Sequence, residues 1–281
     1  IQHPASSIQH PASSIQHPAS SIQHPTPSIV RYRNSPPLPL ERSLRARLSA
    51  MRQELLSKQS SEIRGMFGRI AHRYDFLNRL LSLGRDVRWR KIVAQRVAAA
   101  RPERVLDVCT GTGDLALAMH GATIIGADFC LPMLREAQSK GSSGKRSLSL
   151  CAADALRLPM ADASVDVVTV AFGVRNFADL GAGLCELARV LRPGGELLVL
   201  EFSRPRGFMA PVLGWWMRNV PPRVGRFVSG DREAYSYLPA SVSTFAEGRD
   251  MCRALETAGL TDVDVQRLTG GVASLYRGRR S

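Results

Sequence analysis

The sequence predicts a doubly wound α/β domain, in which a mostly parallel β-sheet carries helices on both faces. First, short apolar segments alternate with amphipathic helical ones from about residue 104 to residue 280. Second, these apolar segments are rich in Val and Leu along their whole length, which is typical of strands buried on both faces. Third, "RVLDVCTGTGDLALAM" (104–119) runs from a strand through a glycine turn into a helix, an arrangement that binds nucleotides at the carboxyl end of a sheet.

Two helices are expected before the sheet. The first, "EIRGMFGRIAHRYDFLNRLLSL" (62–83), places apolar residues on one stripe at steps of three and four. The second is "VRWRKIVAQRVAAA" (87–100). The stripe on the first helix consists of Ile63, Met66, Phe67, Ile70, Tyr74, Leu77 and Leu81.

Strands and helices then follow in turn. The first five strands are expected at "RVLDVC" (104–109), "ATIIGAD" (122–128), "LSLCAAD" (148–154), "VDVVTVAF" (165–172) and "GELLVLEF" (195–202), the last introduced by the turn "RPGG". Helices are expected from about Asp114, at "PMLREAQSK" (132–140), "LGAGLCELARVL" (180–191) and "EGRDMCRALETAG" (247–259). The final strands are "DVDVQRL" (262–268) and "VASLYRGR" (272–279), and residues 203–245 form an insertion after the fifth strand.

Composition limits the class of protein. The 281 residues are 44% hydrophobic and 22% charged, which suits one globular domain with appendages, and no apolar run is long enough for a transmembrane helix. The formal net charge of +14 suits nucleic acid, an anionic membrane or an anionic substrate, and equally a solvated arginine-rich surface. The five cysteines show no metal-ligand spacing, so we expect a reduced intracellular protein without a metal site.

The first fifty residues are expected to be a separate leader, and the globular domain is assigned to residues 51–281. A seven-residue unit, "IQHPASS", recurs with a proline in each copy, which prevents a long helix and predicts disorder. A mis-set start codon, with the functional protein beginning near Met51, is one interpretation. An organellar transit peptide is the other, because residues 29–50 are rich in arginine and poor in acids.

Acidic residues around the glycine turn indicate which nucleotide binds. Asp107 and Asp114 flank Gly111 and Gly113, and two carboxylates would repel a pyrophosphate. They suit S-adenosylmethionine, which carries both an ammonium and a sulfonium. At the ends of the next two strands, Asp128 is placed to accept ribose hydroxyls and Asp154 to meet the adenine edge. A single strand-end Asp is commonly a helix cap, but four of them favour a methyl-donor site.

Several motifs resemble the ubiquinone/menaquinone biosynthesis C-methyltransferase family. They are "FGRIAHRYDFLNRLLSLGRDVRWRK", "LDVCTGTGDLA", "GADFCLPML", "DALRLPMADASVDVVTVAFGVRN", "VLRPGGELLVLEFSRP" and "YSYLPASVSTF". The likeness runs from about Glu62 to Arg279. The first glycine motif is common to many methyltransferases, whereas "FGVRN", "LEFSRP" and "YSYLP" together are much more specific.

The resemblance implies a class I methyltransferase with a Rossmann-like sheet of seven strands, the last antiparallel. It implies methyl transfer from S-adenosylmethionine to a ring carbon of a polyprenylated demethylquinol. The family's donor contacts fall on Thr112, Asp128 and the pair Asp154–Ala155. A family serine is Ala171 here, so that hydroxyl contact is lost or replaced by backbone. "RLLSLG" and "RWRK" favour the bacterial demethylmenaquinone enzymes over the benzoquinone branch.

Candidate catalytic residues lie after the fourth strand and in the insertion. Arg175 of "FGVRN" is expected to face the mouth of the site, where it would stabilise a quinolate oxygen or position a water. An ion pair with Asp179 is the structural alternative. Tyr235 and Tyr237 would hydrogen-bond the quinol or pack as a lid. On the N-terminal helix, beside His72, Tyr74 is expected to belong to the core or a lid rather than to act as a base.

Residues 206–227 interleave aromatic residues with arginines, which favours contact with lipid headgroups. A lid or a homodimer contact is the competing interpretation. We expect a cytoplasmic protein at the inner membrane surface, or an organellar one if the leader is a transit segment. No nucleic-acid partner is expected, because the position after the fourth strand reads "AFGVRN" rather than an Asn/Asp-Pro-Pro-aromatic motif. A non-catalytic donor-binding scaffold is the last alternative.

Overall fold

The computed structural model describes residues 61, 64–69, 71–72, 75–76, 78–79, 82–144, 148–206, 210–211, 214–216, 219–220 and 245–281. The chain divides into two compact units, residues 1–47 and 48–281, and every described residue belongs to the second. The proposed leader, residues 1–50, therefore lies outside the described residues, as does most of the proposed 203–245 insertion.

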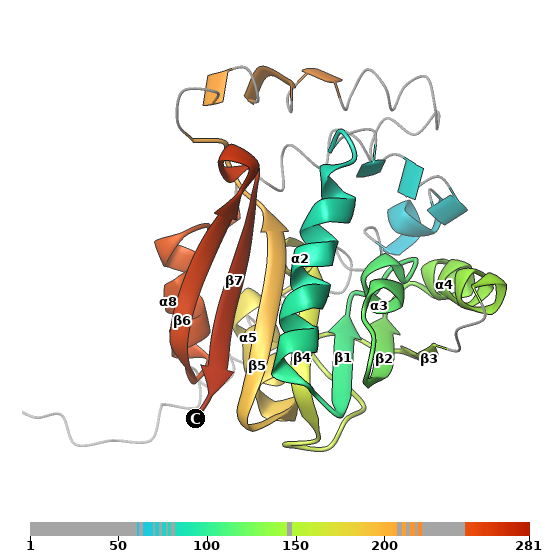
Figure 1. The fold of residues 1–281 in the computed structure, drawn as a ribbon, viewed down its shortest axis with the longest axis vertical. Helices are drawn as coiled ribbons and strands as arrows, with labels where there is room; N and C mark the ends of the chain where they lie inside the picture. The colour runs from blue at the N-terminus through green and yellow to red at the C-terminus, as the bar shows by residue number, and fades with distance from the viewer. Residues whose placement is uncertain are drawn as a thin grey trace, which may run out of the picture. The chain divides into compact units, whose positions relative to one another are not determined.

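Seven strands form one mixed sheet (Figure 1). They are β1 (Arg104–Val108), β2 (Thr123–Asp128), β3 (Ser149–Ala152), β4 (Val165–Ala171), β5 (Leu191–Phe202), β6 (Leu260–Leu268) and β7 (Ala273–Arg280). Their spatial order is β3-β2-β1-β4-β5-β7-β6, and β7 runs antiparallel to both of its neighbours. This confirms the predicted class I sheet with an antiparallel last strand.

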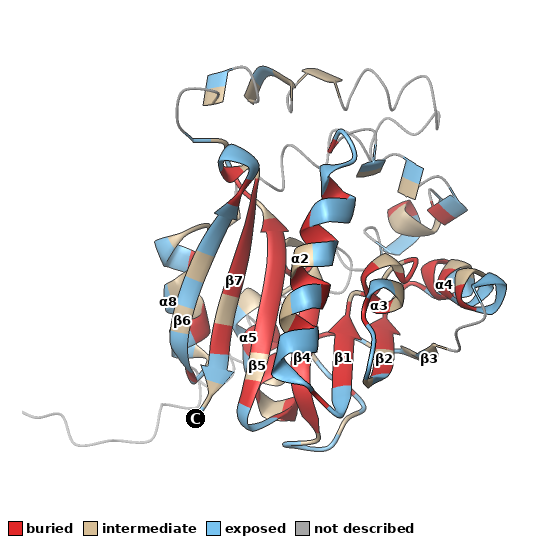
Figure 2. Ribbon diagram, viewed as in Figure 1, coloured by how far each residue is buried: buried red, intermediate tan, exposed pale blue. Residues whose placement is uncertain are grey.

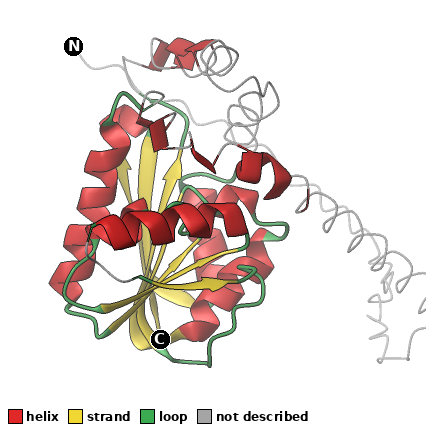
Figure 3. Ribbon diagram, turned by 90° about the vertical axis from the view of Figure 1, so that its right-hand side faces the viewer, coloured by secondary structure: helices red, strands yellow, loops and turns green. Residues whose placement is uncertain are grey.

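Helices cover both faces of the sheet (Figure 3). The described helices are α2 (Arg85–Ala100), α3 (Asp114–Ala118), α4 (Leu131–Ser143), α5 (Leu180–Val190) and α8 (Arg249–Thr257), with 3-10 turns η1 (Val174–Asn176) and η2 (Thr269–Gly271). One core cluster joins the sheet to α5 and α8, and another joins it to α2 and α3. β4 is accordingly buried along almost its whole length, and β5 is buried from Leu197 to Glu201 (Figure 2). Burial on both faces explains their unbroken apolar sequences.

Strand boundaries differ from prediction where the backbone turns. β5 begins at Leu191 rather than at residue 195, because Leu191 already pairs with Val165 and a register shift follows before Val167. Gly194, with φ of +78°, supplies the left-handed conformation inside the "RPGG" turn. β3 ends at Ala152, after which the Ala153 N–H donates to the Asp128 carbonyl and the chain bends toward the site.

The topology gathers the strand ends that matter for function. β1 to β5 are parallel, so their carboxyl ends share one edge of the sheet, where a doubly wound fold places its ligand. Among the described residues, those of 61–79 are helical and lie N-terminal to α2. In the part of the chain that the structure describes, no helix is both long and apolar enough to cross a bilayer.

Candidate functional site

A pocket opens at the carboxyl edge of the sheet. Its hollow measures about 760 Å³, a volume that includes space open to solvent. Most of the wall is apolar, and Asp128 and Asp154 are the two carboxylates among its described residues. The lining residues are Phe67, Val108, Cys109, Gly111, Asp128, Phe129, Cys130, Met133, Ala153, Asp154, Ala155, Leu156, Ala171, Phe172, Gly173, Asn176, Phe177 and Ala178.

Asp128, the last residue of β2, is held rigidly at this pocket. One carboxylate oxygen accepts from the Gly111 N–H and the other from the Cys130 N–H, each at 2.8 Å. Burial raises the pKa of Asp128, while these backbone hydrogen bonds act in the opposite direction. Each oxygen retains a lone pair, so the fixed carboxylate is able to accept hydroxyl donors from a ligand.

The two glycines of the turn have different roles. Both have positive φ, +56° at Gly111 and +81° at Gly113. A Cβ at Gly113 would lie 3.1 Å from the Ala137 Cβ, so this glycine allows α4 to approach the turn. A Cβ at Gly111 would meet only the Cys109 carbonyl at 4.0 Å, and Gly111 lines the pocket. The space beside Gly111 is therefore open for a ligand that contacts the backbone closely.

Asp107 lies below the turn rather than in the pocket wall. It is 1% exposed and accepts hydrogen bonds from the hydroxyls of Thr110 (2.7 Å) and Thr169 (2.6 Å). Burial raises its pKa to about 6, although both hydroxyls and the charge of Arg90 oppose the shift. The carboxylate therefore contributes negative potential from beneath the site and fixes the strand ends of β1 and β4.

Thr112 is engaged within the protein. Its hydroxyl donates to Asp75 Oδ1 at 2.6 Å and accepts from Lys140 Nζ at 3.0 Å. Lys140 also pairs with Asp75 Oδ2 and with Asp114 Oδ1, the latter at 2.6 Å. Asp114 was expected to face a cationic ligand, but its charge is balanced by Lys140 and, at 3.7 Å, by Arg79. We refer to Asp75, Thr112, Asp114 and Lys140 as the Lys140 cluster.

Three further predicted donor contacts line the pocket. Asp154 is exposed after β3, where its Oδ1 accepts from the Leu156 N–H at 2.9 Å. Ala155 is buried beside it, and Ala171 closes β4. The structure thus brings Gly111, Asp128, Asp154, Ala155 and Ala171 around one hollow, while Asp107, Thr112 and Gly113 support it from outside its described lining.

Arg175 is turned into the core instead of toward the mouth of the pocket. Its side chain is 4% exposed, and Nη1 donates to Glu201 Oε1 at 2.7 Å and to the Phe172 carbonyl at 2.6 Å. The Glu201 side chain is fully buried, and Arg175 is not among the described lining residues. The expected placement at the mouth is therefore corrected, because the buried carboxylate at the end of β5 draws the guanidinium inward. A role of Arg175 in the reaction stays a prediction.

Cys109 brings a thiol to the pocket. Burial raises its pKa well above the ordinary value, and the neighbouring carboxylates of Asp128 and Asp107 act in the same direction. A thiol that stays protonated is a poor nucleophile, so Cys109 serves as wall rather than as a reacting group. Among the described residues no group of His, Cys, Asp and Glu side chains could hold a metal ion.

Several predicted residues lie outside the described residues. They are Tyr74, Tyr235 and Tyr237, together with most of 206–227. His72 is described, and its Nδ1 lies 2.6 Å from Glu136 Oε1 on α4.

Some pocket residues had not been predicted. Phe129 directly follows Asp128, and Asn176 belongs to "FGVRN", so strand-end position would have indicated both. Phe67 also lines the pocket, through a tertiary contact that no local pattern shows. The same holds for Lys140 and Glu201, which lie outside the lining and pair with Asp75 and Arg175.

The residues present fit S-adenosylmethionine. The pocket wall is mostly apolar, Gly111 leaves room for close approach, and a fixed carboxylate ends β2 where a ribose would meet it. A dinucleotide is disfavoured, because Asp107 places a buried carboxylate beneath the glycine turn, where a pyrophosphate would lie. The fold and the site together define a class I S-adenosylmethionine-dependent methyltransferase.

Solved structures share this fold. A methyltransferase of Thermotoga maritima, described as a possible histamine N-methyltransferase, has a TM-score of 0.56 at 17% identity and covers 77% of this chain and 99% of its own. The [4+2]-cyclase SpnF has a TM-score of 0.51 at 19% identity, over 69% of this chain and 81% of its own. At these identities the likeness shows the fold alone.

Sequence relatives are more specific. The ubiE/COQ5 methyltransferase family matches residues 55–280. The demethylmenaquinone methyltransferase of Thermus thermophilus is 45% identical over 220 residues, 76% of this chain and 100% of the relative. The ubiquinone/menaquinone biosynthesis C-methyltransferase UbiE of Syntrophotalea carbinolica is 41% identical over 229 residues, 80% of this chain and 96% of the relative. This chain belongs to the ubiE/COQ5 methyltransferase family.

Proposed function

We propose that this enzyme transfers a methyl group from S-adenosylmethionine to a ring carbon of a polyprenylated demethylmenaquinol, giving menaquinol. The observation that carries the proposal is 45% identity to a demethylmenaquinone methyltransferase along that relative's whole length. The apolar pocket at the carboxyl edge supports it, because an aromatic ring requires a largely apolar wall.

S-adenosylmethionine supplies, when bound, a methyl group on a sulfonium that is already an excellent leaving group. The protein's own part is to align the reactants and to exclude water. Asp128, fixed by two backbone N–H groups, holds a hydroxyl-bearing ligand in one orientation. Phe67, Phe129 and Phe177 give the hollow apolar walls that exclude water. The acceptor must be the reduced quinol, because only an electron-rich ring makes carbon a nucleophile.

A benzoquinol of ubiquinone biosynthesis is the second candidate acceptor. It is favoured by the similarity to UbiE of Syntrophotalea carbinolica, whose name covers both quinone pathways. Both acceptors reach the enzyme from a bilayer, so the proposal includes peripheral contact with the inner membrane from the cytoplasmic side. The tryptophans and arginines of residues 206–227 support that contact, and a homodimer through the same segment is its alternative.

A methylation assay tests the acceptor. Purified full-length chain is incubated anaerobically with S-adenosylmethionine and either reduced demethylmenaquinone or the reduced benzoquinone precursor, and products are identified by mass spectrometry. We expect a gain of one methyl group on the naphthoquinol, and none on the same compound kept oxidised. Methylation of the benzoquinol alone would replace the first candidate by the second, and inertness toward both would overturn the proposal.

We propose that Arg175 acts on the reaction through the pocket segment that it holds, because its Nη1 donates to the carbonyl of Phe172 in the pocket wall. Arg175→Met alone leaves the buried Glu201 carboxylate without its cation and is expected to destabilise the fold by about 3 to 5 kcal/mol. In R175M/E201Q the buried carboxylate of Glu201 is replaced by a neutral amide. Most of the lost unfolding free energy should therefore be regained. Turnover that remains lost in the stable double variant, with donor affinity retained, supports a role in the reaction. Turnover that returns with stability shows that Arg175 is structural.

A further inference from the structure

The described residues carry an apolar and basic surface next to the pocket. In the part of the chain that the structure describes, the exposed large hydrophobic side chains are Phe76, Leu83, Val87, Leu131 and Trp215. Leu131 opens α4 after the carboxyl end of β2, and Trp215 follows β5. α2 ends shortly before the amino end of β1, so its first turn lies at the carboxyl edge, about 24 Å away along the helix. Leu83, Val87 and Leu131 therefore lie at the edge that holds the pocket, and Asp75, next to Phe76 in the chain, pairs with Lys140 beside the glycine turn.

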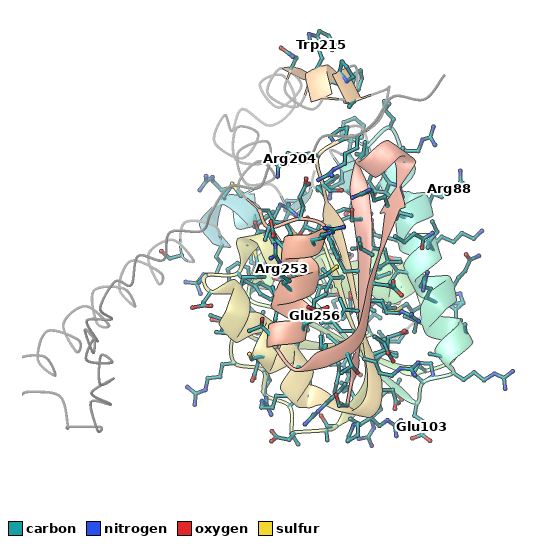
Figure 4. All side chains as sticks on the ribbon, turned by 90° about the vertical axis from the view of Figure 1, so that its left-hand side faces the viewer. Arg88, Glu103, Arg204, Trp215, Arg253 and Glu256 are labelled. Carbon is teal, nitrogen blue, oxygen red and sulfur yellow. The ribbon has the colours of Figure 1, made fainter. Side chains whose placement is uncertain are left out.

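Most of the exposed charge on the N-terminal segment and the first turns of α2 is cationic, although Asp114 lies 3.7 Å from Arg79. Among the described residues from 64 to 91, the exposed ionisable side chains other than His72 are all cationic: Arg64, Arg69, Arg79, Arg85, Arg88 and Lys91. The two carboxylates in the same described residues do not offset these exposed cations, because each already has a partner within the protein. Asp75 pairs with Lys140, and Asp86 is buried with Arg90. Figure 4 shows Arg88 directed away from the ribbon near the upper end of α2.

Leu83 adds an independent observation. It is 60% exposed and has φ of +54°, a left-handed conformation that is uncommon for a bulky non-glycine residue. Neither burial nor backbone preference explains a leucine at this turn. The turn before α2 thus presents a large apolar side chain to solvent.

We propose that Phe76, Leu83 and Val87, together with Arg79, Arg85 and Arg88, form a membrane-docking face that binds anionic lipid. The apolar side chains enter the headgroup boundary and the arginines meet the phosphates, a pairing typical of interfacial proteins. A second copy of the chain fits poorly, because a two-fold contact would oppose cationic patches. Exposed Phe, Leu and Val likewise fit lipid better than a nucleic-acid backbone.

Docking here would place the pocket at the bilayer surface. Phe67, in the same N-terminal segment, lines the pocket. A prenylated quinol would then enter without leaving the lipid, a consequence that rests on the proposed function. The docking itself does not depend on which quinol is the acceptor.

Vesicle flotation of the full chain tests the docking face. Phosphatidylcholine vesicles are compared with vesicles that also contain phosphatidylglycerol. Leu83→Asn removes the apolar group and introduces a residue that tolerates the left-handed region, so its melting temperature should equal or exceed that of the unaltered protein. We expect L83N to weaken binding to the anionic vesicles by about tenfold.

Charge variants complete the test. R85Q/R88Q should weaken anionic binding by about tenfold or more. R101Q/R104Q removes the same charge from exposed arginines at the amino edge and should leave binding unchanged. Equal vesicle binding by L83N, R85Q/R88Q and the unaltered protein would overturn the proposal. So would equal losses in R85Q/R88Q and R101Q/R104Q, or dissociation of a dimer by L83N in sedimentation velocity.

The outcome is separable from that of the proposed function. Donor affinity by calorimetry, and methylation of a quinol with a shortened prenyl chain in detergent micelles, should be the same in L83N and in the unaltered protein. Loss of vesicle binding with these two retained supports the docking face. If L83N loses them as well, the leucine serves the site rather than the membrane, and the proposal fails.

Discussion

Asp107 combines full burial with a carboxyl that must ionise near neutral pH. Burial raises its pKa from 3.8 in a model compound to about 6, so the folded state holds this proton more tightly than the unfolded chain does. The contribution to stability is therefore complete below about pH 4 and is lost as the pH rises through about 6. Two pKa units correspond to roughly 3 kcal/mol of unfolding free energy.

Asp107→Asn removes the contribution of this carboxyl to the pH dependence of the unfolding free energy. The difference in unfolding free energy between the variant and the unaltered protein should shift in the variant's favour by roughly 3 kcal/mol between about pH 4 and pH 7. Urea denaturation across that range, without ligand, measures the difference. A constant difference would show that Asp107 titrates as it does in the unfolded chain.

Cys109 and Gly173 share too little space for two side chains. Cys109 has φ of +54°, and a Cβ at Gly173 would lie 2.5 Å from the Cys109 Cβ and 2.8 Å from its Sγ. Gly173→Ala should therefore destabilise the fold by about 1 to 3 kcal/mol and weaken donor binding. Adding Cys109→Gly removes the opposing atoms and places glycine where φ is positive, so G173A/C109G should recover both. Thermal unfolding and calorimetry of the single and double variants measure the coupling, and additive losses would contradict it.

At the scale of elements, the Lys140 cluster joins the N-terminal segment, the described residues from 61 to 79, to the site. It connects Asp75 of that segment with the glycine turn at Thr112 and with α4 at Lys140. Two more contacts run in parallel, from His72 to Glu136 and from the Cys130 thiol to the Arg64 carbonyl at 3.7 Å. The segment that carries Phe67 is thus fastened to the wall of the pocket through polar contacts.

Lys140→Met should weaken the attachment of the N-terminal segment to the pocket wall, because Asp75 and Asp114 would lose the cation that they share. We expect faster amide hydrogen exchange in residues 64–79 and an affinity for S-adenosylhomocysteine about tenfold lower. Arg135→Met, at an exposed position on the same helix, is the matched control and should change neither. Exchange rates that stay the same in K140M would show that the other contacts suffice.

The elements themselves were largely predictable, and the contacts between them were not. Unbroken apolar strands and the glycine turn define the sheet and the edge where the site lies, because periodicity and turn chemistry are local properties. The inward turn of Arg175 depends on Glu201, 26 residues later, and the engagement of Thr112 depends on Lys140, 28 residues later. Such pairs form only when the sheet brings them together. Local pattern therefore located the pocket, but it could not show that Arg175 turns inward or that Thr112 and Asp114 contact Lys140.

For the whole molecule, the class assignment predicts selective stabilisation by ligand. S-adenosylmethionine or S-adenosylhomocysteine at about 100 times its dissociation constant should add about 2.7 kcal/mol to the unfolding free energy and raise the melting temperature by a few degrees. NAD and FAD should produce no shift, since Asp107 places a buried carboxylate beneath the glycine turn, where their pyrophosphate would lie. Differential scanning fluorimetry measures this, and stabilisation by NAD alone would reverse the assignment of the nucleotide.

The anchoring of Asp128 has a thermodynamic consequence. Its carboxylate is already immobilised by the Gly111 and Cys130 amides, so a ribose that docks there need not freeze a rotating side chain. The entropy of that ordering is lost once, during folding, and is not lost again at each catalytic cycle. Methylated and demethylated forms of the carrier share the same ribose, and hence both benefit equally. Discrimination between S-adenosylmethionine and S-adenosylhomocysteine must then arise where the ligand's sulfur lies, away from β2.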